Sequence, residues 1–323
     1  VFKELIPTLL IASALAAAIV NFTGLAGALG SYVALVAAYL TVSFLFGMRH
    51  DKVKAVDKVM TTLVCAGFLT AFIPWVSILF TVFKRGASAI YWGYFTSDMS
   101  VTSGDDELNM GGLSHAIVGS GIILLIASLI AIPFGIITAV YITEIKGRFS
   151  GLVRIMIQSM SGVPSIVAGL FVFTTYVSAT HGPTALGGSL ALGILMLPTV
   201  ARTAEEVLKL VPDDLRSASL ALGARQWRTT LMVVLPTVRS GLITAGILGV
   251  ARVIGETAPL LLTAGSNSAF WFNPVEGPIA SMPIYVFGML QIGTEYATNR
   301  AWTGALVLML AVFALFFTAR KLG

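Results

Sequence analysis

Residues 202–236, RTAEEVLKLVPDDLRSASLALGARQWRTTLMVVLP, decide how the rest of the sequence is interpreted. The stretch is far more charged than the apolar sequence on either side of it. Pro212, Asp213 and Asp214 are typical of a helix start, because proline is tolerated in the first turn and acids stabilise the positive end of the helix dipole. Gly223 is expected to end this helix. The pattern therefore predicts a short helix near 213–223, followed by a turn and a second helix.

This short helix is expected to carry an exposed apolar face. The residues at roughly helical spacing are Leu215, Ala218, Leu222 and Trp227. An amphipathic segment with basic residues commonly lies on a lipid surface. A docking helix for a cytoplasmic partner explains the same pattern equally well, so both interpretations stay open on physical grounds.

The composition of the chain indicates an integral membrane protein. Of its 323 residues, 57% are hydrophobic and 11% are charged, against about 25% charged in ordinary soluble proteins. These charges are too few to cover a water-soluble fold. The 20 basic residues are dispersed and form no basic stripe, which argues against a nucleic-acid partner.

Eight apolar runs have about the length that a membrane-spanning helix needs, roughly 17–25 residues. They are residues 5–21, 26–47, 59–83, 114–142, 150–178, 186–201, 236–264 and 301–319. Prolines inside the runs are acceptable, because neighbouring helices satisfy the freed backbone groups. We therefore predict an all-α membrane protein of about eight transmembrane helices.

The basic residues orient these spans. With the N-terminus inside, 16 of the 20 lie in cytoplasmic segments, whereas Lys84, Arg85 and Arg300 lie outside and Arg252 lies within a run. This asymmetry predicts that both termini are cytoplasmic. We expect the outer segment 84–113 to be acidic and hydrated. The outer segment 265–300 is rich in aromatic residues and is expected to be interfacial or partly re-entrant.

A charged stretch, 48–58, separates the first two runs from the rest. We therefore expect an N-terminal two-helix hairpin with a cytoplasmic linker over 1–58. A second domain, 59–323, would carry the cytoplasmic loop 203–236.

Two pairs of charged residues fall in or near the predicted spans. Arg202 and Glu205 are three residues apart, and Arg252 and Glu256 are four apart, so each pair shares a helix face. The alternative for both is a neutralised structural ion pair, and the first pair could also reach the cytoplasmic boundary. An arginine deep in the bilayer costs about 2.5–3.5 kcal/mol on insertion scales, so Arg252 in particular indicates a function.

Arginines of this kind suit an oxyanion. The guanidinium stays charged and its planar fork matches phosphate or carboxylate oxygens. Gly241, Ala245 and Gly249 lie near the face of Arg252 and predict close packing against another helix. Phosphate, sulfate and carboxylate substrates all remain compatible with these residues.

The loop resembles that of ATP-binding-cassette importer permeases. Their pattern is EAA, three residues, Gly, nine residues and I-x-L-P. Here Ser217-Ala218-Ser219, Gly223 and Leu235-Pro236 stand at matching spacings, with serines replacing Glu and the last Ala. The resemblance implies that the short helix docks in a cleft of an ATPase subunit. The residues it assigns to coupling are Asp214, Arg216, Ser217, Ala218, Ser219, Gly223 and Ala224.

A narrower resemblance is to phosphate importer permeases of the PstA-like type. It rests on residues 251–261, ARVIGETAPLL, and on Arg202-Thr203 with Glu205 beside the LVPDDLRSASLALGA stretch. It implies a type I (MetI-like) core of six spans, with the hairpin added, in the bacterial inner membrane. It places Arg202, Glu205, Arg252 and Glu256 on the phosphate path. The implied partners are a second permease subunit, two ATPase subunits, an extracytoplasmic phosphate-binding protein and membrane lipid.

No catalytic or cofactor site is expected. The dipeptide Gly-Lys of a phosphate-binding loop is absent, so a partner would hydrolyse ATP. His50, His115 and His181 have no metal-ligand spacing. The alternatives are a permease for another oxyanion, a secondary transporter or channel, and a regulatory membrane protein that senses phosphate. A secondary transporter would have no need of the docking helix.

Overall fold

The structure is a computed structural model that describes every residue except 1, 24–26, 49–51, 181 and 323. The described residues form helices and connecting segments, with no β-strand among them. The all-α fold class is thereby confirmed. The chain divides into two compact units, Val1–Thr81 and Val82–Gly323, and each is described by itself.

The first unit contains α1 (Phe2–Thr23), α2 (Ala28–Met48) and most of α3 (Lys52–Gly86). Small residues fill the contact of α1 with α2, and its buried members are Ala12, Ala16, Ala34, Ala38 and Val42. The Tyr32 hydroxyl donates to the Ala66 carbonyl oxygen over 2.8 Å, which ties α2 to α3. The predicted domain boundary at residue 58 lies inside α3. The charged residues 52–58 of the predicted linker form the first turns of this helix.

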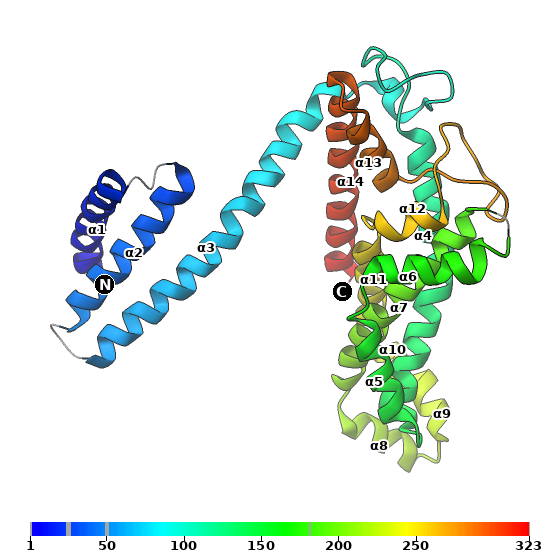
Figure 1. The fold of residues 1–323 in the computed structure, drawn as a ribbon. Coiled ribbons are helices and arrows are strands. Elements are labelled where there is room, and N and C mark those ends of the chain that lie inside the picture. Colours follow the sequence, from blue (N-terminus) through cyan, green and yellow to red (C-terminus); the bar gives the residue numbers. More distant parts are fainter. Residues whose placement is uncertain (1, 24–26, 49–51, 181, 323) are drawn as a thin grey trace. The chain divides into compact units, whose positions relative to one another are not determined.

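The second unit is built around α4 (Ser114–Val140), α7 (Ala185–Lys209), α11 (Arg239–Val253) and α14 (Glu295–Leu322). Helices α4 and α7 lie side by side along much of their length (Figure 1). Gly135 permits this approach, because a Cβ there would lie 2.9 Å from the Cβ of Val200. The core between these helices includes Ile123, Ala127, Leu192, Met196, Val200 and Leu260.

Two of the predicted runs are broken in the structure. The run 150–178 forms α5 (Ser150–Met160) and then α6 (Ser165–Val172), which continues as a π-helical turn, Phe173–Val177, and the two parts meet at 104°. Pro164 adopts an extended ψ of 136° at the break, which ends helical geometry there.

The run 236–264 begins with α10 (Leu235–Thr237), which is bent by 74° from α11, and ends with the separate helix α12 (Ala258–Thr263). Five described helices are long and apolar enough to span a membrane, or seven if each bent pair counts as one span. The predicted total of eight therefore stays a prediction.

Arg300 organises one end of the second unit. It lies in α14, is 1% exposed, and donates to the carbonyl oxygens of five residues of one loop. These acceptors are Ser103, Gly104, Asp106, Glu107 and Met110, at 2.6–3.3 Å. This end also contains the short turns Ala87–Ala89 and Trp92–Phe95, and α13 (Met282–Ile292), which packs on α14. The aromatic segment 265–300 thus contains a packed helix.

Candidate functional site

The short helix in the charged loop is present as α8 (Asp213–Ala221), at the opposite end of its unit from α13 (Figure 1). Pro212 precedes it with an extended backbone, and Asp213 and Asp214 occupy its first turn. Gly223 follows with φ of +83°, a left-handed conformation in which glycine is favoured. The predicted start and stop signals of this helix are therefore confirmed.

Helix α8 exposes its apolar residues. None of its residues is buried, and Leu222 just after it is 90% exposed. Leu215 and Trp227 are also exposed, as the sequence predicted. A second part of the loop folds back as α9 (Gln226–Thr229) and a π-helical turn, Thr230–Val234. The expected helix–turn–helix with an exposed apolar face is confirmed.

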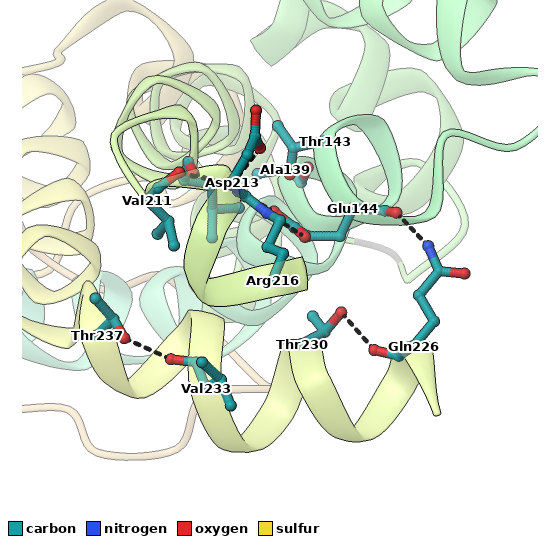
Figure 2. A network of polar contacts seen from close by, with 11 residues as sticks. Ala139, Thr143, Glu144, Val211, Asp213, Arg216, Gln226, Thr230, Val233 and Thr237 are labelled. Carbon is teal, nitrogen blue, oxygen red and sulfur yellow. Dashed lines mark hydrogen bonds and ion pairs between the residues drawn. The ribbon is translucent and has the colours of Figure 1, made fainter. Parts of the chain in front are cut away.

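Arg216 turns away from this exposed face and into the protein. Its Nη2 lies 2.7 Å from Glu144 Oε1 and its Nε lies 3.1 Å from Oε2, so the pair is bidentate (Figure 2). The side chains are 22% and 6% exposed. The Glu144 carboxylate raises the pKa of Arg216, since it stabilises the charged guanidinium.

Glu144 occupies a special position at the end of α4. It lies in a π-helical turn, Tyr141–Ile145, that extends this helix, and Lys146 then adopts a left-handed φ of 48°. The backbone oxygen of Glu144 accepts a 2.6 Å hydrogen bond from Gln226 Nε2 of α9. One residue therefore holds both α8 and α9. The sequence analysis missed it, and the only available signal was a lone carboxylate at the end of a long apolar run.

A pocket of about 630 Å³ lies behind α8. Its lining includes Thr143, Glu144, Lys146, Arg154, Lys209 and Arg216. Apolar residues such as Ile142 and Leu220 complete the lining beside these polar and charged residues.

Glu205 is buried on α7, but its partners differ from those expected. Its Oε1 lies 3.0 Å from Arg154 Nε of α5 and 3.0 Å from Lys209 Nζ. Arg202 is exposed, and among the described residues it makes no ion pair with Glu205. The alternative that Arg202 and Glu205 form a structural ion pair with each other is wrong, because Lys209 one turn further along and Arg154 of α5 reach the carboxylate.

These residues share a second pocket, of about 410 Å³. Arg154, Arg202 and Lys209 contribute three cations to its lining, and Glu205 and Glu206 contribute two carboxylates. The structure thus brings Arg202 and Glu205 to one cavity without pairing them. Arg252 does not line that pocket.

Arg252 and Glu256 do form an ion pair, through Arg252 Nη1 and Glu256 Oε1. The helix is not continuous between them: Arg252 lies in the last turn of α11, and Glu256 lies in the break before α12. Arg252 is 56% exposed within this chain and Glu256 is 16% exposed. The guanidinium therefore retains accessible donors.

The small residues near Arg252 pack as predicted. A Cβ added to Gly241 would lie 2.6 Å from Val207 Cγ1, and one added to Gly249 would lie 2.5 Å from Val200 Cγ2. Ala245 is fully buried. This face of α11 therefore lies directly against α7, the helix that carries Arg202 and Glu205.

Comparison with known proteins shows which family the chain is similar to. Residues 131–319 match the model of the binding-protein-dependent transport system inner membrane component. The phosphate transport system permease protein PstA of Mycobacterium leprae is 39% identical over 264 residues, which are 79% of this chain and 84% of that protein. PstA of Pasteurella multocida is 37% identical over 279 residues, 83% of this chain and 96% of that protein.

A solved structure agrees in fold. An inward-facing structure of the MetNI methionine ABC transporter aligns with a TM-score of 0.53 and 17% identity, over 65% of this chain and 92% of that one. The likeness supports the MetI-like fold of the chain.

Proposed function

The chain belongs to the family of binding-protein-dependent transport system inner membrane components, and from this premise we propose that it is the permease subunit of an ATP-driven importer of inorganic phosphate. It is a multi-pass membrane protein that works with other subunits of an ABC transporter. The observation that carries the substrate is the similarity, along most of the chain, to permeases named for phosphate transport.

The proposed assembly contains a second permease subunit, two ATPase subunits and an extracytoplasmic phosphate-binding protein. Both termini lie in the cytoplasm, as the distribution of basic residues indicates. The exposed apolar face of α8 supports an ATPase-docking role, because an unpartnered helix face of this kind needs a partner to cover it. The sequence has no Gly-Lys dipeptide, so ATP hydrolysis belongs to the partner subunits.

The proposed phosphate path runs along the faces of α7 and α11. Arg252 at the break after α11 offers its fork to a phosphate, while Glu256 holds the guanidinium when the path is empty. Nearer the cytoplasm, Arg202 lines the pocket beside Glu205. The exposure of both arginines within the single chain supports this role, since neither guanidinium is saturated by internal partners.

Uptake of radiolabelled phosphate by the assembled transporter in proteoliposomes tests the proposal. We expect ATP-dependent uptake of phosphate, and a decrease of more than about tenfold in Arg252→Gln, because a charge-assisted hydrogen bond contributes about 1.5–3 kcal/mol. Arg239→Gln removes an exposed arginine at the other end of α11 and serves as the matched control.

Three outcomes would contradict the proposal. Uptake of sulfate but not phosphate by the wild type would assign another oxyanion. Uptake that needs no ATP would indicate a secondary transporter or channel. Equal uptake by Arg252→Gln and Arg239→Gln would show that Arg252 has no role in the phosphate path.

A further inference from the structure

We propose that the Glu144–Arg216 ion pair is the mechanical connection between α8 and the membrane spans, so that it converts movement of the ATPase subunits into movement of α4 and α7. The inference rests on the proposed function, because it needs an ATPase that moves α8. In this proposal Arg216 connects α8 to the spans of the permease itself, and Glu144 is the residue of α4 that receives the connection.

The attachments of α8 are few. None of its residues is buried, so apolar packing does not fix it to the spans. Within the part of the chain that the structure describes, side-chain hydrogen bonds from α8 to other elements occur at two positions. One is Arg216, and the other is Ser219, whose hydroxyl lies 2.9 Å from that of Thr229. Of these, only Arg216 reaches the membrane spans.

Arg216 joins two spans at once. Its Nη2 donates to Glu144 Oε1 at the end of α4 and also to the Leu208 carbonyl oxygen, 3.0 Å away in the last turn of α7. Its Nη1 donates to the Val211 carbonyl oxygen over 2.6 Å. A displacement of α8 therefore pulls on the ends of α4 and α7 together.

The geometry requires arginine. With Nε on Glu144 Oε2 and the second Nη1 hydrogen on Asp213, all five N–H groups of the guanidinium have an acceptor. Lysine keeps the positive charge but has three donors on one atom, and it cannot span the same set of acceptors. Arg216→Lys therefore removes the connection while the net charge of the loop stays the same.

The far side of the connection leads to the proposed phosphate path. Helix α7 continues from Leu208 back through Glu205 and Arg202, and it packs along α4 at Ala139 and Ala204. Gln226 holds the Glu144 backbone from α9, so this turn of α4 is fixed from two sides. Rigid coupling of this kind can pass a movement at α8 to the residues that line the path.

The number of phosphate ions transported per ATP hydrolysed tests the inference, measured with the assembled transporter in proteoliposomes. We expect this ratio to fall about tenfold in Arg216→Lys and in Glu144→Gln, equivalent to about 1.4 kcal/mol of lost coupling. Arg148→Lys and Glu295→Gln make the same chemical changes at exposed positions outside this pair and are expected to keep the wild-type ratio.

The ratio separates this role from a merely structural one. Loss of folded transporter lowers uptake and ATP hydrolysis in equal proportion, and that result in both variants would overturn the inference. Failure of both variants to assemble would also overturn it, since the pair would then be needed for folding. Absence of phosphate uptake by the wild type would instead refute the proposed function.

Discussion

Two arginines at opposite ends of the second unit use the same side chain in different ways. Arg300 is fully buried in α14 and binds five carbonyl oxygens of one loop, with no carboxylate among them. Arg216 is partly exposed and binds a carboxylate together with carbonyl oxygens near the ends of two spans.

We call Arg300 an anchor, because it fixes one loop, and Arg216 a connector, because it joins separate elements. All five acceptors of Arg300 lie within residues 103–110, so it fixes the shape of one loop on one helix. Arg216 joins a surface helix to α4 and α7 over a pocket of about 630 Å³. We therefore expect the end that carries Arg300 to stay rigid, whereas the end that carries α8 is proposed to transmit movement.

The largest expected effect is the loss of stability on removing Arg300. Arg300→Gln leaves the buried Gly104 carbonyl oxygen and several partly buried ones without a donor, and a buried unsatisfied group costs about 1–3 kcal/mol, so we expect a loss of about 3 kcal/mol in total. The melting temperature of the detergent-solubilised protein measures it. Arg320→Gln, at an exposed position of the same helix, is the control, and an equal effect of the two would contradict the anchor.

A smaller loss is expected at Arg216. Its pair with Glu144 is partly hydrated, so Arg216→Gln should cost about 1–2 kcal/mol, which is less than Arg300→Gln. The same melting experiment compares the two directly. A loss at Arg216 as large as that at Arg300 would mean that the inner end is equally rigid.

Glu205 offers a further way to sharpen the comparison. Glu205→Gln removes the carboxylate that Arg154 and Lys209 share, which leaves the inner pocket more positive. We expect phosphate inside the vesicles to inhibit uptake at concentrations about 2–5-fold lower, in line with the energy of ion pairs whose cations are hydrated. If phosphate inhibits Glu205→Gln and the wild type at the same concentration, this pocket does not bind phosphate before its release into the cytoplasm.

The smallest effect concerns the pH dependence of stability and involves Asp98, in the connection between α3 and α4. The Ser100 hydroxyl and backbone N–H both donate to Asp98 Oδ1 and hold the pKa of Asp98 below its usual range. A carboxyl with a lowered folded-state pKa stabilises the fold above its unfolded pKa of about 3.9, and this contribution is lost as pH falls through the folded value.

The melting temperature followed from neutral pH into the acid range tests this contribution. Asp98→Asn should abolish a small part of the acid sensitivity of the wild type. Asp105→Asn, an exposed acid in the same loop, is the matched control. An identical acid response of the wild type and Asp98→Asn would contradict the stabilising role of the carboxylate.

The sequence predicted local features well, because their signals are local. The proline, acids and glycine around α8 act within one helix, and they defined its start and stop. The small residues of α11 likewise predicted its close packing. The breaks at Pro164 and after Val253 were missed, because a proline in an apolar run is compatible with either a kinked span or two separate helices.

Contacts between distant residues could not be predicted in the same way. Glu205 meets Arg154, 51 positions away, and Arg216 meets Glu144, 72 positions away. Nothing in the spacing of one sequence distinguishes these partners from the nearer Arg202. The sequence assigned no role to the N-terminal hairpin, whose two helices α1 and α2 are present in the structure.

The most direct test measures phosphate transported per ATP hydrolysed in Arg216→Lys and Arg300→Lys side by side, together with the amount of assembled transporter. Arg216→Lys should keep its assembly and lose about tenfold in the ratio. Arg300→Lys should lose assembled transporter, while what remains keeps the wild-type ratio. A wild-type ratio in Arg216→Lys, or an equal fall of the ratio in both variants, would contradict the division of the two ends into a connector and an anchor.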